Sequence, residues 1–147
     1  MFQVFQPSNQ DIASCAEVYL SAYRSKPWNE TFDKTTIENY ILSYCHSDTM
    51  KCFAAAIDHT IIGIALALLV PSIHTPYLRI EDFCIELESQ RKGYGTLFIH
   101  SILKEAKKLG CDSVLLNTQR NFPSHKFYLK NGFSEIESVL LYSKIKL

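Results

Sequence analysis

The chain has 147 residues, of which 47% are hydrophobic and 20% are charged. This length and this balance are typical of one globular domain over residues 1–147, and they exclude a disordered chain. Fifteen basic and fifteen acidic side chains give a formal net charge of zero, so the sequence lacks the excess of Lys and Arg that nucleic-acid-binding domains carry.

Targeting and redox signals favour a cytoplasmic protein. The first six residues lack the basic start and apolar run of a signal peptide. The longest apolar stretch, Ile61–Val70, is too short to span a membrane. Five cysteines are scattered, with no Cys-x-x-Cys pair and no histidine at zinc-ligand spacing. We therefore predict free thiols, no metal, no membrane contact and no nucleic-acid partner.

Strand and helix patterns alternate along the chain without repeats or linkers. Ser8 or Asn9 can cap the first helix, and Asp33 or Thr35 can cap the second. In chain order the predicted elements are strand 2–5, a helix to about residue 23, loop 25–30, a helix through residue 44, hairpin strands 52–57 and 61–70, loop 71–76, strand 78–85, helix 95–109, strand 113–118, a helix around residue 128, and one or two closing strands in 133–147. This order predicts an α/β or α+β fold whose sheet carries helices on both faces.

The most informative segment is Gln90-Arg91-Lys92-Gly93-Tyr94-Gly95-Thr96, which joins strand 78–85 to helix 95–109. Two glycines allow a tight turn and a close approach of another molecule, and the helix behind them directs free N–H groups into it. Such a turn suits a phosphate. The run does not fit a nucleoside-triphosphate loop, and Phe98 occupies the third small position of a dinucleotide fingerprint.

A second segment, Asn121 to Phe133, follows the apolar stretch Val114 to Leu116. Asn121, Ser124 and Tyr128 stand at i, i+3 and i+7, which predicts that they share one face of a helix. Gly132 stands where a left-handed helix cap is expected.

These two segments, in this order, resemble the Gln-x-x-Gly-x-Gly and Asn-x-x-Ala-x-x-Phe-Tyr-x-x-x-Gly-Phe motifs of the Gcn5-related N-acetyltransferases (GNAT family), with Ser124 in place of the commoner alanine. The resemblance implies a mixed, mostly antiparallel sheet in which a splayed strand pair binds the coenzyme A arm. It also implies acetyl-coenzyme A as co-substrate, and a homodimer is common in the family.

The resemblance further implies roles for individual residues. Phe83 and Ile85 would offer backbone groups to the pantetheine or the thioester, Asn121 and Ser124 would contact the pantetheine, and Tyr128 would protonate the leaving sulfur. Cys84 stands where the thioester passes, although a small buried hydrophobic residue is the simpler interpretation of this thiol. The residues implied at the pyrophosphate are Gln90, Arg91, Lys92, Gly93, Tyr94, Gly95 and Thr96.

An amine must lose its proton before it attacks a thioester, so a base is useful. Glu81 and Asp82 are adjacent in Arg79-Ile80-Glu81-Asp82-Phe83-Cys84-Ile85, a run similar to a strand of glucosamine-6-phosphate N-acetyltransferases. Because neighbouring strand residues point to opposite faces, we expect one carboxylate at the substrate and predict that it is Glu81. The alternative is that Glu81 pairs with Arg79 on the same face.

The acceptor is the least determined part of the sequence prediction. Pro27-Trp28-Asn29-Glu30 sets an aromatic ring beside an acid, which suits a cation, although a lone Trp also packs under helix pairs. The candidate acceptor residues are Tyr23, Trp28, Glu30 and Tyr77. A small amine, an amino sugar and a peptide N-terminus stay open, as do a non-catalytic acetyl-coenzyme A sensor and an unrelated nucleotide or flavin binder.

Overall fold

The computed structural model describes residues 1–146. The chain divides into two compact units, Met1–Asn117 and the residues from Thr118 onward. The single domain over 1–147 stays a prediction.

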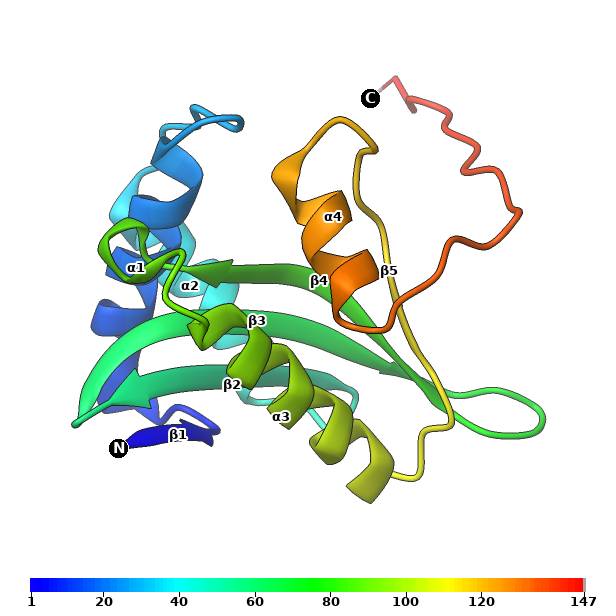
Figure 1. Ribbon diagram of the computed structural model, residues 1–147, viewed down its shortest axis with the longest axis horizontal. Helices are drawn as coiled ribbons and strands as arrows, with labels where there is room; N and C mark the ends of the chain where they lie inside the picture. Colours follow the sequence, from blue (N-terminus) through cyan, green and yellow to red (C-terminus); the bar gives the residue numbers. More distant parts are fainter. Residues whose placement is uncertain (147) are drawn as a thin grey trace. The chain divides into compact units, whose positions relative to one another are not determined.

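The first unit contains a five-stranded sheet in the order β1-β2-β3-β4-β5 (Figure 1). Neighbouring strands from β1 to β4 are antiparallel, and β5 is parallel to β4. The strands are β1 (Phe2–Phe5), β2 (Met50–Ile57), β3 (Thr60–Val70), β4 (Tyr77–Ile85) and β5 (Val114–Leu116). The prediction of a mixed, mostly antiparallel sheet is confirmed, with β5 shorter than the predicted strand 113–118.

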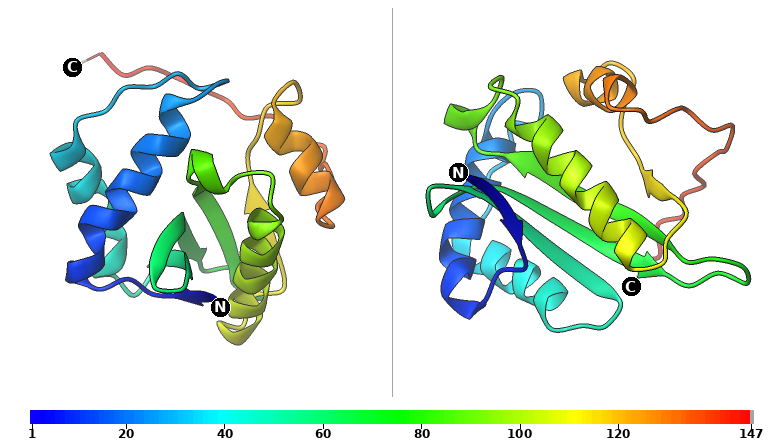
Figure 2. Two further views of the ribbon diagram at one scale, coloured as in Figure 1. Left: turned by 60° about the vertical axis from the view of Figure 1, so that its left-hand side comes forward. Right: turned by 60° about the horizontal axis from the view of Figure 1, so that its bottom comes forward.

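Helices cover both faces of this sheet, as predicted. Figure 2 shows α1 (Ile12–Arg24) and α2 (Lys34–Cys45) on one face and α3 (Tyr94–Lys108) on the other. Short 3-10 helices, η1 (Asn9–Asp11) and η2 (Leu87–Ser89), precede α1 and α3. Asp33 caps α2, because its carboxylate accepts a hydrogen bond from the Thr36 N–H at 3.0 Å. No helix among the described residues has the length and apolar character needed to cross a membrane.

Strand side chains alternate between two apolar layers. Cys52, Ala54, Ile64, Leu66 and Cys84 belong to the buried cluster that includes α1 and α2. On the opposite face Phe83 stacks on Phe98 of α3, with ring centroids 5.1 Å apart. Burial on both faces explains why β2 and β3 read as continuous apolar runs.

One extra residue in β4 interrupts this alternation. Leu66 pairs with Asp82, whereas its neighbour Ala67 pairs with Ile80, so Glu81 is the additional residue of a β-bulge. Further along, Leu68 pairs with Arg79 and packs against the α1–α2 cluster, as Leu66 does. Arg79 and Asp82 therefore lie on the same face of the sheet, although three positions separate them in the sequence.

The second unit contains one helix, α4 (Pro123–Lys130), among its described residues. Gly132 has a φ of +90°, which confirms the left-handed helix cap. The predicted closing strands are wrong for residues 134–146, which form no strand; Leu147 lies outside the described residues.

Gly63 makes the contact between β3 and the α3 layer possible. A Cβ atom at this position would meet Cδ1 of Ile85 at 2.7 Å and Cδ1 of Phe98 at 3.2 Å. We expect Gly63→Ala to lower the free energy of unfolding by about 1–3 kcal/mol, because it overpacks this contact. Urea denaturation measures the change, and Thr60→Ala at an exposed end of β3 is the control, with an expected effect within about 0.5 kcal/mol.

The contact between Gly63 and Ile85 can also be tested with a double mutant. Ile85→Val removes the atom closest to the new Cβ, so it should cost less stability in the Gly63→Ala background than in the wild type. Equal costs in both backgrounds would contradict the packing argument.

Candidate active site

The turn before α3 has the geometry of an anion-binding loop. Arg91 and Gly93 both have positive φ, at 64° and 86°, and Gly93 is the N-cap residue of α3. The Gln90 side-chain amide donates to the Ile85 carbonyl at 2.8 Å, which ties the turn to the end of β4. A left-handed φ at the cap explains the glycine at position 93.

The backbone donors of this turn lie at the N-terminus of α3. The first bond of the helix runs from the Leu97 N–H to the Gly93 carbonyl at 3.3 Å. The N–H groups of Tyr94, Gly95 and Thr96 therefore have no acceptor within the helix. A Cβ atom at Gly93 would meet nothing within 4 Å, so the Cβ side of this residue is open.

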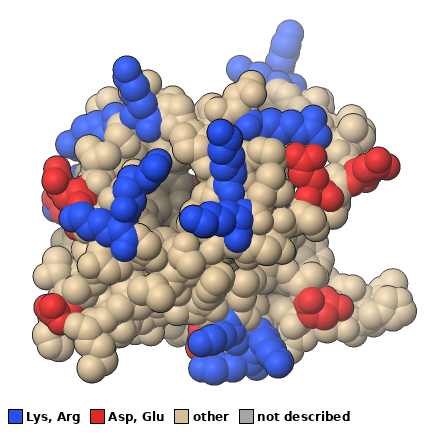
Figure 3. All heavy atoms as spheres, in the orientation of Figure 1, with Lys and Arg blue, Asp and Glu red and all other residues tan. Residues whose placement is uncertain are grey.

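Charge at the turn is also suitable for an anion. Arg91 and Lys92 are exposed, and Figure 3 shows basic side chains projecting on the face that carries the start of α3. With the positive end of the helix dipole, these groups fit a pyrophosphate.

The edge of β4 beside the turn offers further backbone groups. β5 pairs with β4 only over Leu78 to Ile80, and β4 continues to Ile85. The Glu86 N–H donates to the Ile62 carbonyl of β3 at 2.8 Å. Since backbone groups alternate in direction along a strand, those of Phe83 and Ile85 point away from β3, toward the side of β5. A splayed strand pair stays a prediction.

The sequence suggested that the two adjacent carboxylates of β4 point to opposite faces of the sheet. The structure does not show this arrangement. The Arg79 Nε donates to Glu81 Oε1 at 2.5 Å, so Glu81 lies toward Arg79 and is largely exposed. Arg79 shares its face with Asp82, because the bulge at Glu81 changes the alternation. The expectation of one carboxylate on each face is therefore wrong, and the predicted pairing alternative for Glu81 is present.

Asp82 is the residue whose environment the sequence did not predict. Its Oδ1 accepts hydrogen bonds from the hydroxyls of Tyr19 (3.1 Å) and Tyr23 (3.3 Å). Its Oδ2 accepts a hydrogen bond from the Tyr40 hydroxyl at 2.6 Å. These four residues form what we call the tyrosine–Asp82 cluster. Spacing offered one signal, since Tyr19 and Tyr23 stand one helical turn apart on α1.

The phenols of the cluster keep their protons. Burial, and then the negative charge of Asp82, raise the pKa of Tyr19. Burial, and then the hydrogen bond to Asp82, raise the pKa of Tyr40. Both hydroxyls therefore remain donors to the Asp82 carboxylate at every physiological pH.

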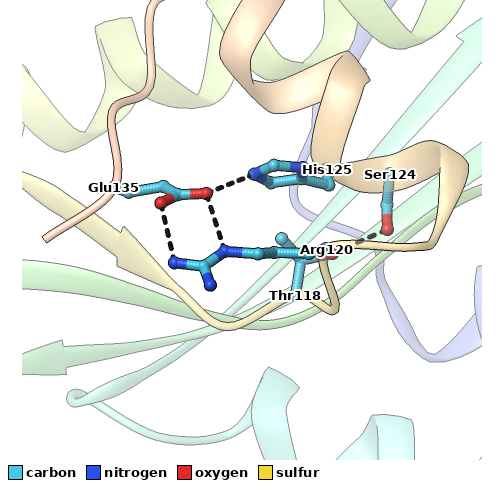
Figure 4. Close-up of polar contacts among 5 residues, drawn as sticks. All are labelled: Thr118, Arg120, Ser124, His125 and Glu135. Carbon is cyan, nitrogen blue, oxygen red and sulfur yellow. Dashed lines mark hydrogen bonds and ion pairs between the residues drawn. The ribbon is translucent and has the colours of Figure 1, made fainter. Parts of the chain in front are cut away.

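The second unit holds the other predicted cofactor residues, of which Figure 4 shows Ser124. Asn121 lies before α4, so the prediction that it shares a helix face with Ser124 and Tyr128 is wrong. Pro123 is the first residue of the helix, and it keeps Phe122 in an extended conformation (φ −90°, ψ 150°). The Ser124 hydroxyl bonds with that of Thr118 at 2.7 Å. Tyr128 is buried, and its ring packs between those of Phe127 and Phe133.

Glu135 connects the residues after α4 to those before it. Arg120 donates to both of its carboxylate oxygens, at 3.3 and 3.0 Å, and His125 Nε2 lies 2.7 Å from Oε1 (Figure 4). These bonds orient the start of α4, where Ser124 lies.

The predicted acceptor residues lie in two places. The Trp28 ring packs edge-on against Tyr23, with centroids 5.3 Å apart, and is 36% exposed. The Glu30 N–H donates to the Tyr23 carbonyl at 2.8 Å. Tyr77 lies at the first position of β4. Over residues 1–146, no group of three or more His, Cys, Asp or Glu side chains could hold a metal ion.

The family of this chain follows from its similarity to known proteins. Residues 12–133 match the family model described as Acetyltransferase (GNAT) family. The chain therefore belongs to the GNAT acetyltransferase family, whose co-substrate is acetyl-coenzyme A.

Individual relatives are distant. Over 110 residues the chain is 26% identical to Streptothricin acetyltransferase A of Bacillus subtilis (strain 168), an alignment that covers 74% of this chain and 60% of that protein. A GNAT family acetyltransferase from Staphylococcus aureus is similar in structure, with a TM-score of 0.78 and 17% identity over 97% of this chain and 98% of its own. An aminoglycoside acetyltransferase from an uncultured soil metagenomic sample, solved in complex with sisomicin, also has a TM-score of 0.78, with 14% identity over 99% and 97%.

The thiols differ sharply in their environments. Burial raises the pKa of Cys84, which lies in the α1–α2 cluster, and burial also raises the pKa of Cys15 to about 12. A hydrogen bond from the Cys52 thiol lowers the pKa of Cys45, whereas that bond and burial raise the pKa of Cys52.

We therefore expect iodoacetamide at pH 7.5 to alkylate Cys45 first, about tenfold or more faster than the other thiols, because the thiolate is the reacting form. Peptide mass spectrometry over time measures the five rates. Rapid labelling of Cys84 in the native protein would contradict its assignment as an inert core residue.

Proposed function

We propose that this protein is an acetyl-coenzyme A-dependent N-acetyltransferase that modifies a primary amine of a small molecule, such as an amino sugar or an aminoglycoside-like compound. The observation that carries the proposal is the left-handed Gly93 cap at the end of the η2–α3 connection, where the first N–H groups of α3 have no acceptor within the helix and the Cβ side of Gly93 is open. The family match supports this use of the turn.

The pyrophosphate would lie at the N-terminus of α3. The N–H groups of Tyr94, Gly95 and Thr96 would donate to it, and Arg91 and Lys92 would add positive charge. Each charge-assisted hydrogen bond contributes about 1.5–3 kcal/mol, so a few are sufficient for a stable complex. Gln90 would act indirectly, since its amide holds the turn against the Ile85 carbonyl.

The pantetheine arm would follow the edge of β4. The backbone groups of Phe83 and Ile85 point to this edge, and a donor there would stabilise the negative charge that develops on the thioester oxygen. Cys84 lies between them in the sequence, but its side chain belongs to the core on the other face. Asn121 and Ser124 are proposed to contact the pantetheine.

The chemical step is proposed to be direct attack of the amine on the thioester in a ternary complex. Glu81 would take the proton from the amine, because it is exposed and its carboxylate is held by one ion pair with Arg79. Tyr128 would donate a proton to the leaving sulfur. No thiol is needed as a covalent intermediate.

The identity of the acceptor is proposed from distant similarity and from the aromatic residues of α1 and the loop after it. Streptothricin and aminoglycoside acetyltransferases are among the similar proteins, which favours a small molecule over a peptide. Tyr23, Trp28, Glu30 and Tyr77 are the proposed contacts. A homodimer and a cytoplasmic location stay predictions.

Calorimetry with acetyl-coenzyme A tests the cofactor site. We expect Gly93→Ala to weaken binding by about tenfold or more, because a side chain disfavours the φ of +86° and would cover the open turn. Gly110→Ala is a matched control, since Gly110 has a φ of +83° and equally open surroundings at the far end of α3; it should bind normally. Similar binding of ATP, NAD and FAD by the wild type would overturn the proposal.

Steady-state kinetics test the two proposed proton-transfer residues. Glu81→Gln and Tyr128→Phe should each lower kcat by about 10²-fold or more and leave acetyl-coenzyme A binding near normal. The deficit of Glu81→Gln should shrink as pH rises toward 10, because the amine then loses its proton to water. Glu88→Gln, at an exposed site on η2, is the control. Full rates in both variants at all pH values would refute these roles and leave the family assignment intact.

A further inference from the structure

The tyrosine–Asp82 cluster is built around one carboxylate, that of Asp82. Asp82 is half-buried, and none of the ion pairs among residues 1–146 includes it. The negative charge of Glu30 also acts on Tyr19, since it adds to the effects of burial and Asp82 that raise the pKa of this phenol. The cluster therefore has net negative charge at neutral pH.

Aromatic rings surround this charge. The Tyr19 ring centroid lies 4.5 Å from that of Tyr23 and 6.2 Å from that of Tyr40, and Phe32 lies 5.9 Å from Tyr19. Trp28 extends the ring series to the surface. The faces of aromatic rings attract organic cations, and the attraction increases when the cation is partly removed from water.

The carboxylate retains capacity for another donor. Two oxygens offer about four lone-pair positions, and three phenol hydroxyls occupy three of them. One acceptor position of Asp82 therefore remains for a further donor, beside those that the three tyrosines occupy.

We infer that the tyrosine–Asp82 cluster binds a second, non-reacting cationic group of the acceptor, so that the preferred substrate carries at least two positive charges. This inference rests on the proposed function. It follows from a requirement of the chemistry: the amine that attacks must be neutral, whereas an adjacent carboxylate favours the ammonium form. Asp82, whose oxygens already accept three hydrogen bonds, therefore suits a cation that stays charged, while Glu81 is proposed to bind the reacting group as an ammonium and to accept its proton before the attack.

Nuclear magnetic resonance titration of the full-length protein, without acetyl-coenzyme A, tests the inference with 1,5-diaminopentane and n-pentylamine as probes. The two probes share a chain length and differ in the second charge. We expect the wild type to bind the diamine at least about tenfold more tightly, the scale of one charge-assisted hydrogen bond. A wild type that binds both equally would overturn the inference, and this comparison needs no variant.

The assignment to Asp82 is tested by Asp82→Asn, which keeps the shape of the side chain and removes its charge. The two dissociation constants should then differ by less than about twofold, whereas Asp112→Asn at an exposed site should keep the wild-type preference. Persistence of the preference in Asp82→Asn would refute the assignment.

A measurement of acetyl-coenzyme A binding distinguishes a failure of this inference from a failure of the proposed function. Asp82→Asn should bind acetyl-coenzyme A with wild-type affinity, which also establishes that the variant is folded. If the wild type bound no acetyl-coenzyme A, the proposed function would fail. If it bound acetyl-coenzyme A and showed no preference for the diamine, the inference about the acceptor would fail alone.

Discussion

The bulge at Glu81 is the constraint on which the arrangement of the site depends. A regular strand would place Arg79 and Asp82 on opposite faces, because three positions separate them. With one extra residue in β4, both lie on the face covered by α1 and α2, while Phe83 and Ile85 lie toward α3. The strand is thereby divided into a segment that presents acidic side chains and a segment whose backbone leads to the Gly93 turn.

Much of the fold could be predicted because its signals are local. Asp33 caps α2, Asp58 and His59 turn the β2–β3 hairpin with positive φ, and Gly93 begins α3, each through the conformational preferences of a few adjacent residues. The bulge has no such signal. The bulge is defined by pairing between strands, since the adjacent residues Leu66 and Ala67 of β3 pair with residues of β4 that are two positions apart. The sequence of β4 alone implied a regular alternation of side chains.

The candidate site likewise has one part that local sequence signals predict and one part that they do not. The turn at residues 90–96 is local and was identified from its glycines. The environment of Asp82 depends on hydroxyls that lie 42 to 63 residues away on α1 and α2, so only the packed structure brings them together. The prediction that Asn121 lies on α4 was wrong for a local reason, because Pro123 sets the start of this helix. The i, i+3, i+7 spacing, on which that prediction rested, took no account of this proline.

The zero net charge of the chain is compatible with an acceptor of several positive charges. Net charge describes the field at distances beyond the Debye length, which is about 8 Å at physiological ionic strength. A cation at the tyrosine–Asp82 cluster would instead experience a half-buried carboxylate at contact distance, in a region where rings replace much of the water. Because Coulomb energies increase as the effective dielectric constant falls, one such carboxylate attracts a bound cation more strongly than many exposed acidic side chains do. Under the proposed assignment, the local chemistry of α1, α2 and β4 would set the preference for the acceptor, and the composition of the chain contains no information about it.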